Sequence, residues 1–212
     1  MMTREEKKQA FMRVLSRYIP AAAVEWSAEF VLRHSVKMKI TPERSSKLGD
    51  YRHPFGKDGH QITINHDLNP VAFLVTFVHE AAHLEAWVKH RNRVAPHGRE
   101  WQAEFARLLR EVMQLRAFPE EVVHHFLSRG ESLTASSCSD PKLNKILRKY
   151  DKNNGTLLLE ELEEGTVFAL KNGDTFRKGE KQRTRYKCFS LDKQRWYLVS
   201  GVAEVNPVNT TG

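Results

Sequence analysis

The residues best suited to do chemistry lie in the segment His79-Glu80-Ala81-Ala82-His83. Residues four apart on a helix share one face, so the two imidazoles can reach a single metal ion. Zinc in a catalytic site takes three protein ligands and leaves a fourth position for water. Glu80 follows the first histidine and can serve as the general base for that water. The motif therefore predicts one Zn²⁺ ion per chain and a hydrolytic reaction.

The third ligand is open at this stage. His97, in Ala95-Pro96-His97-Gly98, precedes the next expected helix, and Gly98 permits a close approach of the backbone. Glu100 and Glu104 on that helix compete with it, because some zinc peptidases take a carboxylate from a second helix. Histidines satisfied by backbone carbonyls would need no metal. The apolar residues before the motif argue against this alternative, since a buried glutamate between two histidines is costly without a metal.

The elements that must position the motif are predicted from hydrophobic periodicity. An apolar helix is expected from residue 71 to about 89, opened by Asn69-Pro70, with proline in the first turn. The other expected helices are 5–18, 21–33, 99–115 and a shorter one from 117, and the expected strands are 36–40, 48–52 and 61–65. We therefore expect an α+β domain over residues 1–130, with two N-terminal helices, a small sheet and the metal-bearing helix.

The composition changes after this domain. Residues 131–164 are expected to form a linker with a short basic helix at 141–150. Strand-like runs at 167–170, 184–189 and 196–199, separated by turns at Asn172-Gly173 and Lys178-Gly179, predict a small basic β-module over 165–205.

Two segments, Phe77-Val-His-Glu-Ala-Ala-His83 and His97-Gly-Arg-Glu-Trp101, together resemble the SprT-like family, which includes the Spartan proteases. Residues 47–51 and 62–65 resemble the strand pair that precedes the family's active-site helix. The resemblance covers roughly residues 5–130 and implies the family's minimal zincin fold.

The resemblance implies that His79, His83 and His97 are the zinc ligands and that Glu80 is the catalytic base. It also implies a peptidase, and Spartan-like members digest proteins crosslinked to DNA. The tail departs from the family, because many members carry a zinc ribbon of paired cysteines where this chain has Tyr186-Lys-Cys188. One thiolate cannot hold a structural zinc, so we expect no second metal.

Positive charge is concentrated in the β-module. The chain of 212 residues has a formal net charge of +8, and residues 166–200 hold nine Lys or Arg against three acidic residues. Arg183, Arg185 and Lys187 alternate along one expected strand near Trp196 or Tyr197, a combination suited to phosphates and stacked bases. These residues are candidate contacts for single-stranded DNA. The alternative is a solvated face whose lysines discourage edge pairing.

The sequence favours a cytoplasmic protein without a membrane segment, since the longest apolar run, 71–75, is short and the N-terminus is charged. Three hypotheses follow: a zinc peptidase acting on DNA-associated proteins, a zinc peptidase indifferent to DNA, and a non-enzymatic nucleic-acid-binding or regulatory protein with a structural zinc. Glu80 argues against the third, because a structural site needs no base. Tyr51, His90 and Arg93 are candidates for stabilising the oxyanion. Cleavage specificity and oligomeric state stay open.

Overall fold

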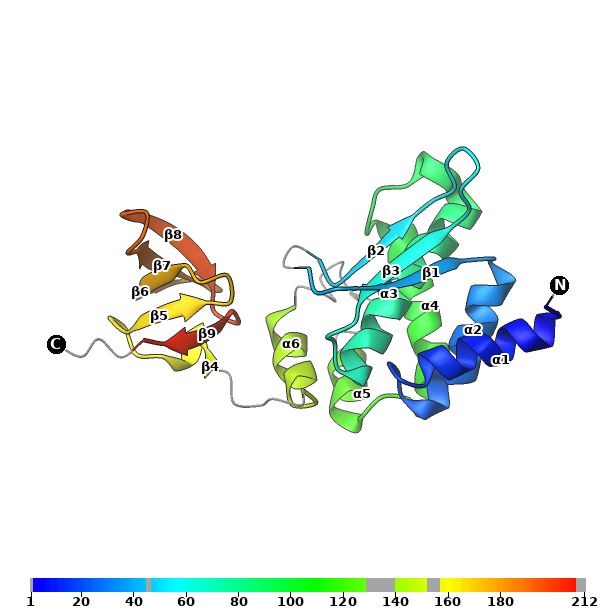
Figure 1. Ribbon diagram of the computed structural model, residues 1–212, viewed down its shortest axis with the longest axis horizontal. Helices are drawn as coiled ribbons and strands as arrows, with labels where there is room; N and C mark the ends of the chain where they lie inside the picture. The colour runs from blue at the N-terminus through cyan, green and yellow to red at the C-terminus, as the bar shows by residue number, and fades with distance from the viewer. Residues whose placement is uncertain (1, 45–46, 129–139, 152–156, 209–212) are drawn as a thin grey trace. The chain divides into compact units, whose positions relative to one another are not determined.

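The computed structural model describes residues 2–44, 47–128, 140–151 and 157–208. The chain divides into two compact units, Met1–Asp151 and Lys152–Gly212, each with its own hydrophobic core. Helices and a mixed sheet form the first unit, and a second sheet forms the other, so the chain is α+β as expected. Both units are seen in Figure 1.

The first unit begins with a helical hairpin. Helix α1, Arg4–Leu15, starts at a capping box in which Thr3 and Glu6 satisfy each other's backbone N–H groups. A 3₁₀ turn, Ala21–Ala23, leads into α2, Val24–Arg33. Lys8 on α1 forms ion pairs with two glutamates of α2, which adds to the apolar contact between the helices.

Three strands form the sheet of the first unit: β1, Lys37–Thr41; β2, Gly49–Arg52; and β3, Gln61–Asn65. Their order is β1-β3-β2, with β1 parallel and β2 antiparallel to the central β3. Ile62 and Ile64 of β3 are fully buried. Strand β2 is therefore an edge strand, paired on one side only.

Helix α3, Pro70–His90, lies behind this sheet, with α4, Arg99–Gln114, packed against it (Figure 1). Asn69 caps α3 by accepting a hydrogen bond from the Ala72 N–H, and Pro70 occupies the first turn. Helix α3 is long and apolar enough to cross a membrane, and 78% of its most apolar window is buried within the protein. Its apolar character is that of the central helix of a core.

A short helix that composition assigns to the linker belongs to the first unit. Helix α5, Glu120–Leu127, is followed by α6, Pro141–Arg148, whose Leu143 and Leu147 are buried in the first core. The side chain of Asn69 also donates to the Leu147 carbonyl. The first unit thus extends to Asp151, beyond the boundary at 130 expected from the sequence. The reason is that the apolar side chains of α6 pack into the core of the first unit.

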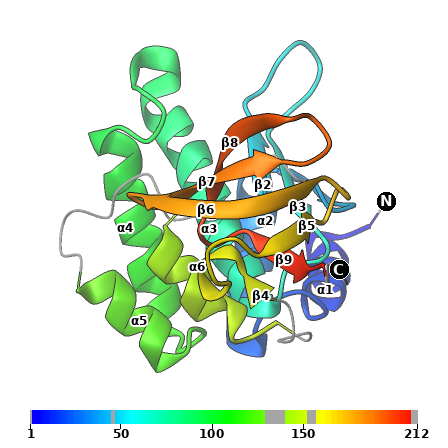
Figure 2. The same ribbon diagram turned by 90° about the vertical axis from the view of Figure 1, so that its left-hand side faces the viewer.

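The second unit is one antiparallel sheet, seen from another side in Figure 2. Its strand order is β4-β9-β5-β6-β7-β8. The elements are β4, Leu157–Leu158; a 3₁₀ turn, Leu159–Glu161; β5, Val167–Leu170; β6, Thr175–Gln182; β7, Arg185–Ser190; β8, Arg195–Ser200; and β9, Glu204–Pro207. The three expected strand runs coincide with β5, β7 and β8.

The expected turn at Lys178-Gly179 is instead part of β6. A register shift falls between Lys178 and Lys181, and a Cβ at Gly179 would collide with the Lys187 carbonyl of the neighbouring strand. Glycine here permits a close backbone approach within a bulged strand rather than a reversal of the chain.

Cys188 is buried and carries a free thiol, whereas Cys138 lies outside the described residues.

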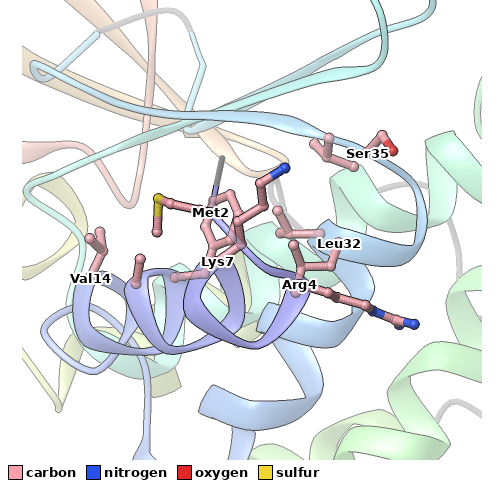
Figure 3. Close-up of a pocket in the computed structure, with 10 residues that line it drawn as sticks. Met2, Arg4, Lys7, Val14, Leu32 and Ser35 are labelled. Atoms are coloured by element: carbon pink, nitrogen blue, oxygen red, sulfur yellow. The ribbon is translucent and has the colours of Figure 1, made fainter.

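A groove of about 680 Å³ lies between α1, α2 and the two residues that precede β1, as Figure 3 shows. Apolar side chains such as Phe11, Val14 and Val36 line it, with Arg4 and Lys7 among the lining residues. None of the candidate site residues contributes to this groove. The chemistry predicted from the sequence therefore has to be sought around α3.

Candidate metal centre

Three imidazoles converge between α3 and the loop before α4. His79 and His83 lie one turn apart on α3, and His97 reaches them from the residue before Gly98, the N-cap of α4. The Nε2 atoms of the three rings form a triangle with sides of 2.9, 3.1 and 3.3 Å. Among the residues that the structure describes, the ligand atoms of these three histidines lie close enough together to hold one metal ion.

This triangle fits a tetrahedral metal ion. Ligand nitrogens at 2.0–2.1 Å from zinc in a tetrahedral site lie about 3.3 Å apart. Hydrogen bonds alone explain the triangle poorly, because a neutral imidazole carries one N–H, which can point well at only one of two partners. A shared cation satisfies all three nitrogen lone pairs at once.

Aromatic side chains hold the three imidazoles in place. Trp101, 1% exposed, packs with its ring centroid 4.8 Å from those of His79 and His97 and 5.3 Å from that of His83.

Burial and mutual repulsion lower the pKa of His79 to about 3 and that of His83 to about 4. Burial also lowers the pKa of His97. The histidines are therefore neutral, the form that binds a metal.

Glu80 directly follows His79 on α3 and is 6% exposed. Its carboxylate accepts a hydrogen bond from the Tyr51 backbone N–H on the free edge of β2. Burial, and to a lesser degree the charge of Asp50, raises the pKa of Glu80 to about 8. A raised pKa makes the ionised form of this carboxyl a stronger proton acceptor than an exposed carboxylate.

The competing carboxylates are committed elsewhere. Glu104 on α4 accepts hydrogen bonds from Lys89 and Arg107, at 2.6 and 3.0 Å. Glu100 is exposed in the first turn of α4 and lies outside the histidine cluster. The geometry therefore assigns the third position to His97.

Tyr51 is the oxyanion candidate that lies at the site. Its ring is parallel to that of His83, with centroids 6.5 Å apart, and its hydroxyl is 2.8 Å from His60 Nδ1. Burial raises the pKa of Tyr51, so the phenol keeps its proton and can donate. His90 and Arg93 do not line the small cavity beside the histidines, which Tyr51 does.

His60 and Gly49 are residues of the site that sequence reasoning did not single out. His60 lies in the segment interpreted only as a hairpin connection, and the register of β2 with β3 brings it to Tyr51. Gly49 lies against Glu80, where an added Cβ would come within 2.7 Å of the carboxylate Oε1. No local pattern identifies either one.

The candidate nucleic-acid residues of the second unit divide between a strand face and a turn. Arg185 and Lys187 share the outer face of β7, and Lys187 Nζ lies 5.0 Å from the ring centroid of Trp196 on β8. Arg183 is not on this strand. It lies in the turn before β7 with a φ of 56°, since β6 extends further than the sequence indicated.

The structure adds three residues to this outer face and removes one candidate from it. Phe189 of β7 contacts Trp196 at a ring-centroid distance of 5.2 Å. Arg177 of β6 lies opposite Phe189, and Leu198 of β8 lies opposite Lys187. Tyr197 points to the opposite side, where it packs on Phe176. We call Arg177, Arg185, Lys187, Phe189, Trp196 and Leu198 the outer face of the second unit.

No family model, curated protein or solved structure matches this chain. The assignment of chemistry therefore depends on the geometry of the three histidines and Glu80. The three imidazoles lie together in the structure, and helical spacing in the sequence predicts the pairing of His79 with His83.

Proposed function

We propose that this protein is a zinc-dependent peptidase whose ion is held by His79, His83 and His97. The observation that carries the proposal is the triangle of three Nε2 atoms beside a buried glutamate that is not one of the ligands. The α+β fold supports the SprT-like zincin architecture implied by the sequence, in which a helix and the residues after it supply the ligands.

Zinc in a three-histidine site acts as a Lewis acid and lowers the pKa of a water to about 7. Glu80 accepts the proton from the attacking water and passes it to the leaving amine. The Tyr51 phenol lies beside His83 and stays protonated, so it can donate a hydrogen bond to the developing oxyanion. Trp101 keeps the imidazoles in place through these changes in charge.

The buried position of Glu80 favours an enzyme over a structural zinc site. Burying a carboxylate that is 6% exposed costs stability, and a structural ion would not need this residue, because Glu80 is not one of the ligands. A structural site also closes all four coordination positions with protein atoms. Three protein ligands leave one position for a substrate or water.

The test is cleavage of an unfolded protein by the zinc-loaded chain, with zinc quantified in each variant. Glu80→Gln is expected to keep one zinc per chain and lose activity by about 10²-fold or more. His97→Ala is expected to lose zinc and activity together. Glu100→Gln is the matched control, because this exposed carboxylate was a competing ligand and should change neither property. Full activity of Glu80→Gln would refute the assignment of the base.

We further propose that the substrates are DNA-associated proteins and that the outer face of the second unit binds single-stranded DNA. Arg185, Lys187 and Arg177 supply positive charge, and Trp196, which is 56% exposed, supplies a ring on which a base can stack. The alternative of a DNA-independent peptidase predicts that this face contributes nothing to cleavage.

Fluorescence titration with a labelled single-stranded oligonucleotide tests this part of the proposal. Arg185→Gln and Lys187→Gln should each weaken binding and reduce its dependence on salt by about one ion per lost contact. Arg110→Gln, an exposed arginine of α4, serves as the charge-matched control. Loss of DNA-stimulated cleavage in the first two variants would support the proposal, and equal cleavage with and without DNA would favour the alternative.

A further inference from the structure

A small cavity of about 130 Å³ lies beside the candidate metal centre. Its walls include Tyr51, His83, Trp87, Arg91, Pro96 and Trp101. His83 is both a wall of the cavity and one of the three converging histidines. A side chain next to a bond cleaved at the centre can therefore reach this space, because neighbouring residues of an extended chain are only about 3.3 Å apart.

The cavity carries a positive charge without an acidic neighbour. Arg91 lines it, and no aspartate or glutamate is among its lining residues. Within the part of the chain that the structure describes, no carboxylate forms an ion pair with Arg91. Two other cations of α3 and α4, Lys89 and Arg107, each form ion pairs with acidic side chains. Arg91 therefore differs from them in leaving its charge available to a ligand.

A carboxylate is the ligand that complements this lining best. It supplies only acceptors, whereas a guanidinium supplies only donors in a fixed, planar arrangement. The only charged side chain among the residues that line the cavity is the one of Arg91.

Arg91 is held in place rather than extended into solvent. Its guanidinium lies 4.2 Å from the centroid of the Trp87 ring, which stacks in turn on His53 with an interplanar angle of 4°. At the end of α3, Arg91 has φ 56° and ψ −141°, a conformation that favours glycine. The chain thus accepts backbone strain at the residue that presents the charge.

We propose that this cavity selects substrates with an aspartate or glutamate beside the scissile bond, and that Arg91 binds the side-chain carboxylate. This specificity rests on the proposed peptidase function. The volume supports a short side chain, since a cavity of about 150 Å³ holds a molecule the size of benzene. A planar guanidinium can also bind a carboxylate through two parallel hydrogen bonds, which fixes the orientation of the substrate.

The test uses the zinc-loaded full chain and quenched fluorescent peptides that differ only at the two positions flanking the cleaved bond. At one of these positions, kcat/KM is expected to be at least about tenfold higher for glutamate than for glutamine. Equal rates for the two, or a preference for an aliphatic residue at both positions, would overturn the proposal. This comparison needs no variant, so it does not depend on how a substitution folds.

Variants then assign the preference to Arg91. In Arg91→Gln the ratio of glutamate to glutamine rates should fall to about one, and Arg91→Lys should keep part of it, because the charge remains without the planar fork. Arg93→Gln is the matched control, since this exposed arginine lies two residues away and does not line the cavity. A preference that survives in Arg91→Gln would refute the role of Arg91.

Peptide binding to zinc-loaded Glu80→Gln separates this proposal from the peptidase function. One outcome is that the natural chain cleaves no peptide, but the glutamate peptide binds more tightly than the glutamine peptide and Arg91→Gln abolishes this difference. The cavity proposal then stands and the peptidase proposal fails. If peptides are cleaved without any such difference in binding or rate, the peptidase proposal stands and the cavity proposal fails.

Discussion

At the scale of single residues, the position of the Glu80 carboxylate depends on a residue that has no side chain. A Cβ at Gly49 would lie 2.7 Å from Glu80 Oε1 and 2.7 Å from Thr76 Cγ2. We therefore predict that Gly49→Ala displaces the carboxylate and lowers kcat by about 10²-fold, the cost of a misplacement of about 1 Å. Steady-state kinetics with zinc quantification would measure the effect, and the zinc content should not change.

Gly59→Ala is the matched control for this prediction. Gly59 also lies near the sheet of the first unit, but the nearest atom to an added Cβ is the Ser35 carbonyl at 3.9 Å, an ordinary contact. Its kcat should equal that of the natural chain. If the kcat of Gly49→Ala also equalled that of the natural chain, the position of the Glu80 carboxylate would not depend on the absence of a side chain at residue 49.

The sequence alone identified the part of the site that is local in the chain. His79 and His83 follow from helical spacing, because residues one turn apart share a face, and Glu80 follows from its place directly after the first histidine of the motif. The third ligand, His97, needed either the family resemblance or the structure, since a loop brings it back from 14 residues away. His60, Gly49 and Arg91 could not be predicted, because strand register and side-chain packing bring them to the site.

At the scale of elements, α6 is a part of the first core. Leu143 is fully buried and Leu147 is 7% exposed. Leu143→Ala is expected to destabilise the first unit by about 2–5 kcal/mol, the cost of a large-to-small change in a packed core. Urea unfolding monitored by tryptophan fluorescence measures the difference, since three of the four tryptophans belong to this unit.

Lys142→Ala provides the comparison within the same helix, because Lys142 is exposed. It should change the free energy of unfolding by less than about 0.5 kcal/mol. If Leu143→Ala were equally mild, α6 would be a loosely attached segment rather than a part of the core.

Periodicity predicted the long helices and the three strands of the first sheet well. Helices such as α4 bury one face, so their sequences carry the period of the structure, whereas α3 and β3 are buried on most sides and are marked by nearly continuous apolar residues. In the second unit, β6 was missed because its pattern is interrupted. Lys178 points into the unit, where its ammonium lies over the Tyr186 ring and donates to the Leu162 carbonyl, and Gly179 follows in a bulge. A buried lysine reverses the alternation expected of a strand.

At the scale of the whole molecule, two separate cores predict two separate responses to metal removal. The proposed ligands all belong to the first unit and join α3 to the loop before α4. An ion that binds only the folded form stabilises it, by about 2.7 kcal/mol when its free concentration is 100 times Kd. A chelator should therefore lower the Tm of the first unit and leave that of the second unchanged.

Calorimetry of the full chain with and without the chelator measures both transitions. His97→Ala is the informative comparison, because the Tm of its first unit should no longer respond to the chelator. Equal shifts of both transitions, or a response that persists in this variant, would contradict a site confined to the three histidines.

Under the proposed function, the free edge of β2 also determines which proteins can be cut. Leu48 pairs with Asn65 through a backbone hydrogen bond, so the alternation of an antiparallel ladder turns the backbone groups of Gly49 and Tyr51 outward, where the Tyr51 N–H donates to Glu80. An extended segment can pair with the outward groups that Glu80 does not use, whereas a helix or an inner strand has already used its own backbone groups. Cleavage of a folded protein therefore waits for local opening, and its rate should follow the population of opened molecules. Under the proposed function, the enzyme would discriminate among proteins by their stability before it reads any side chain.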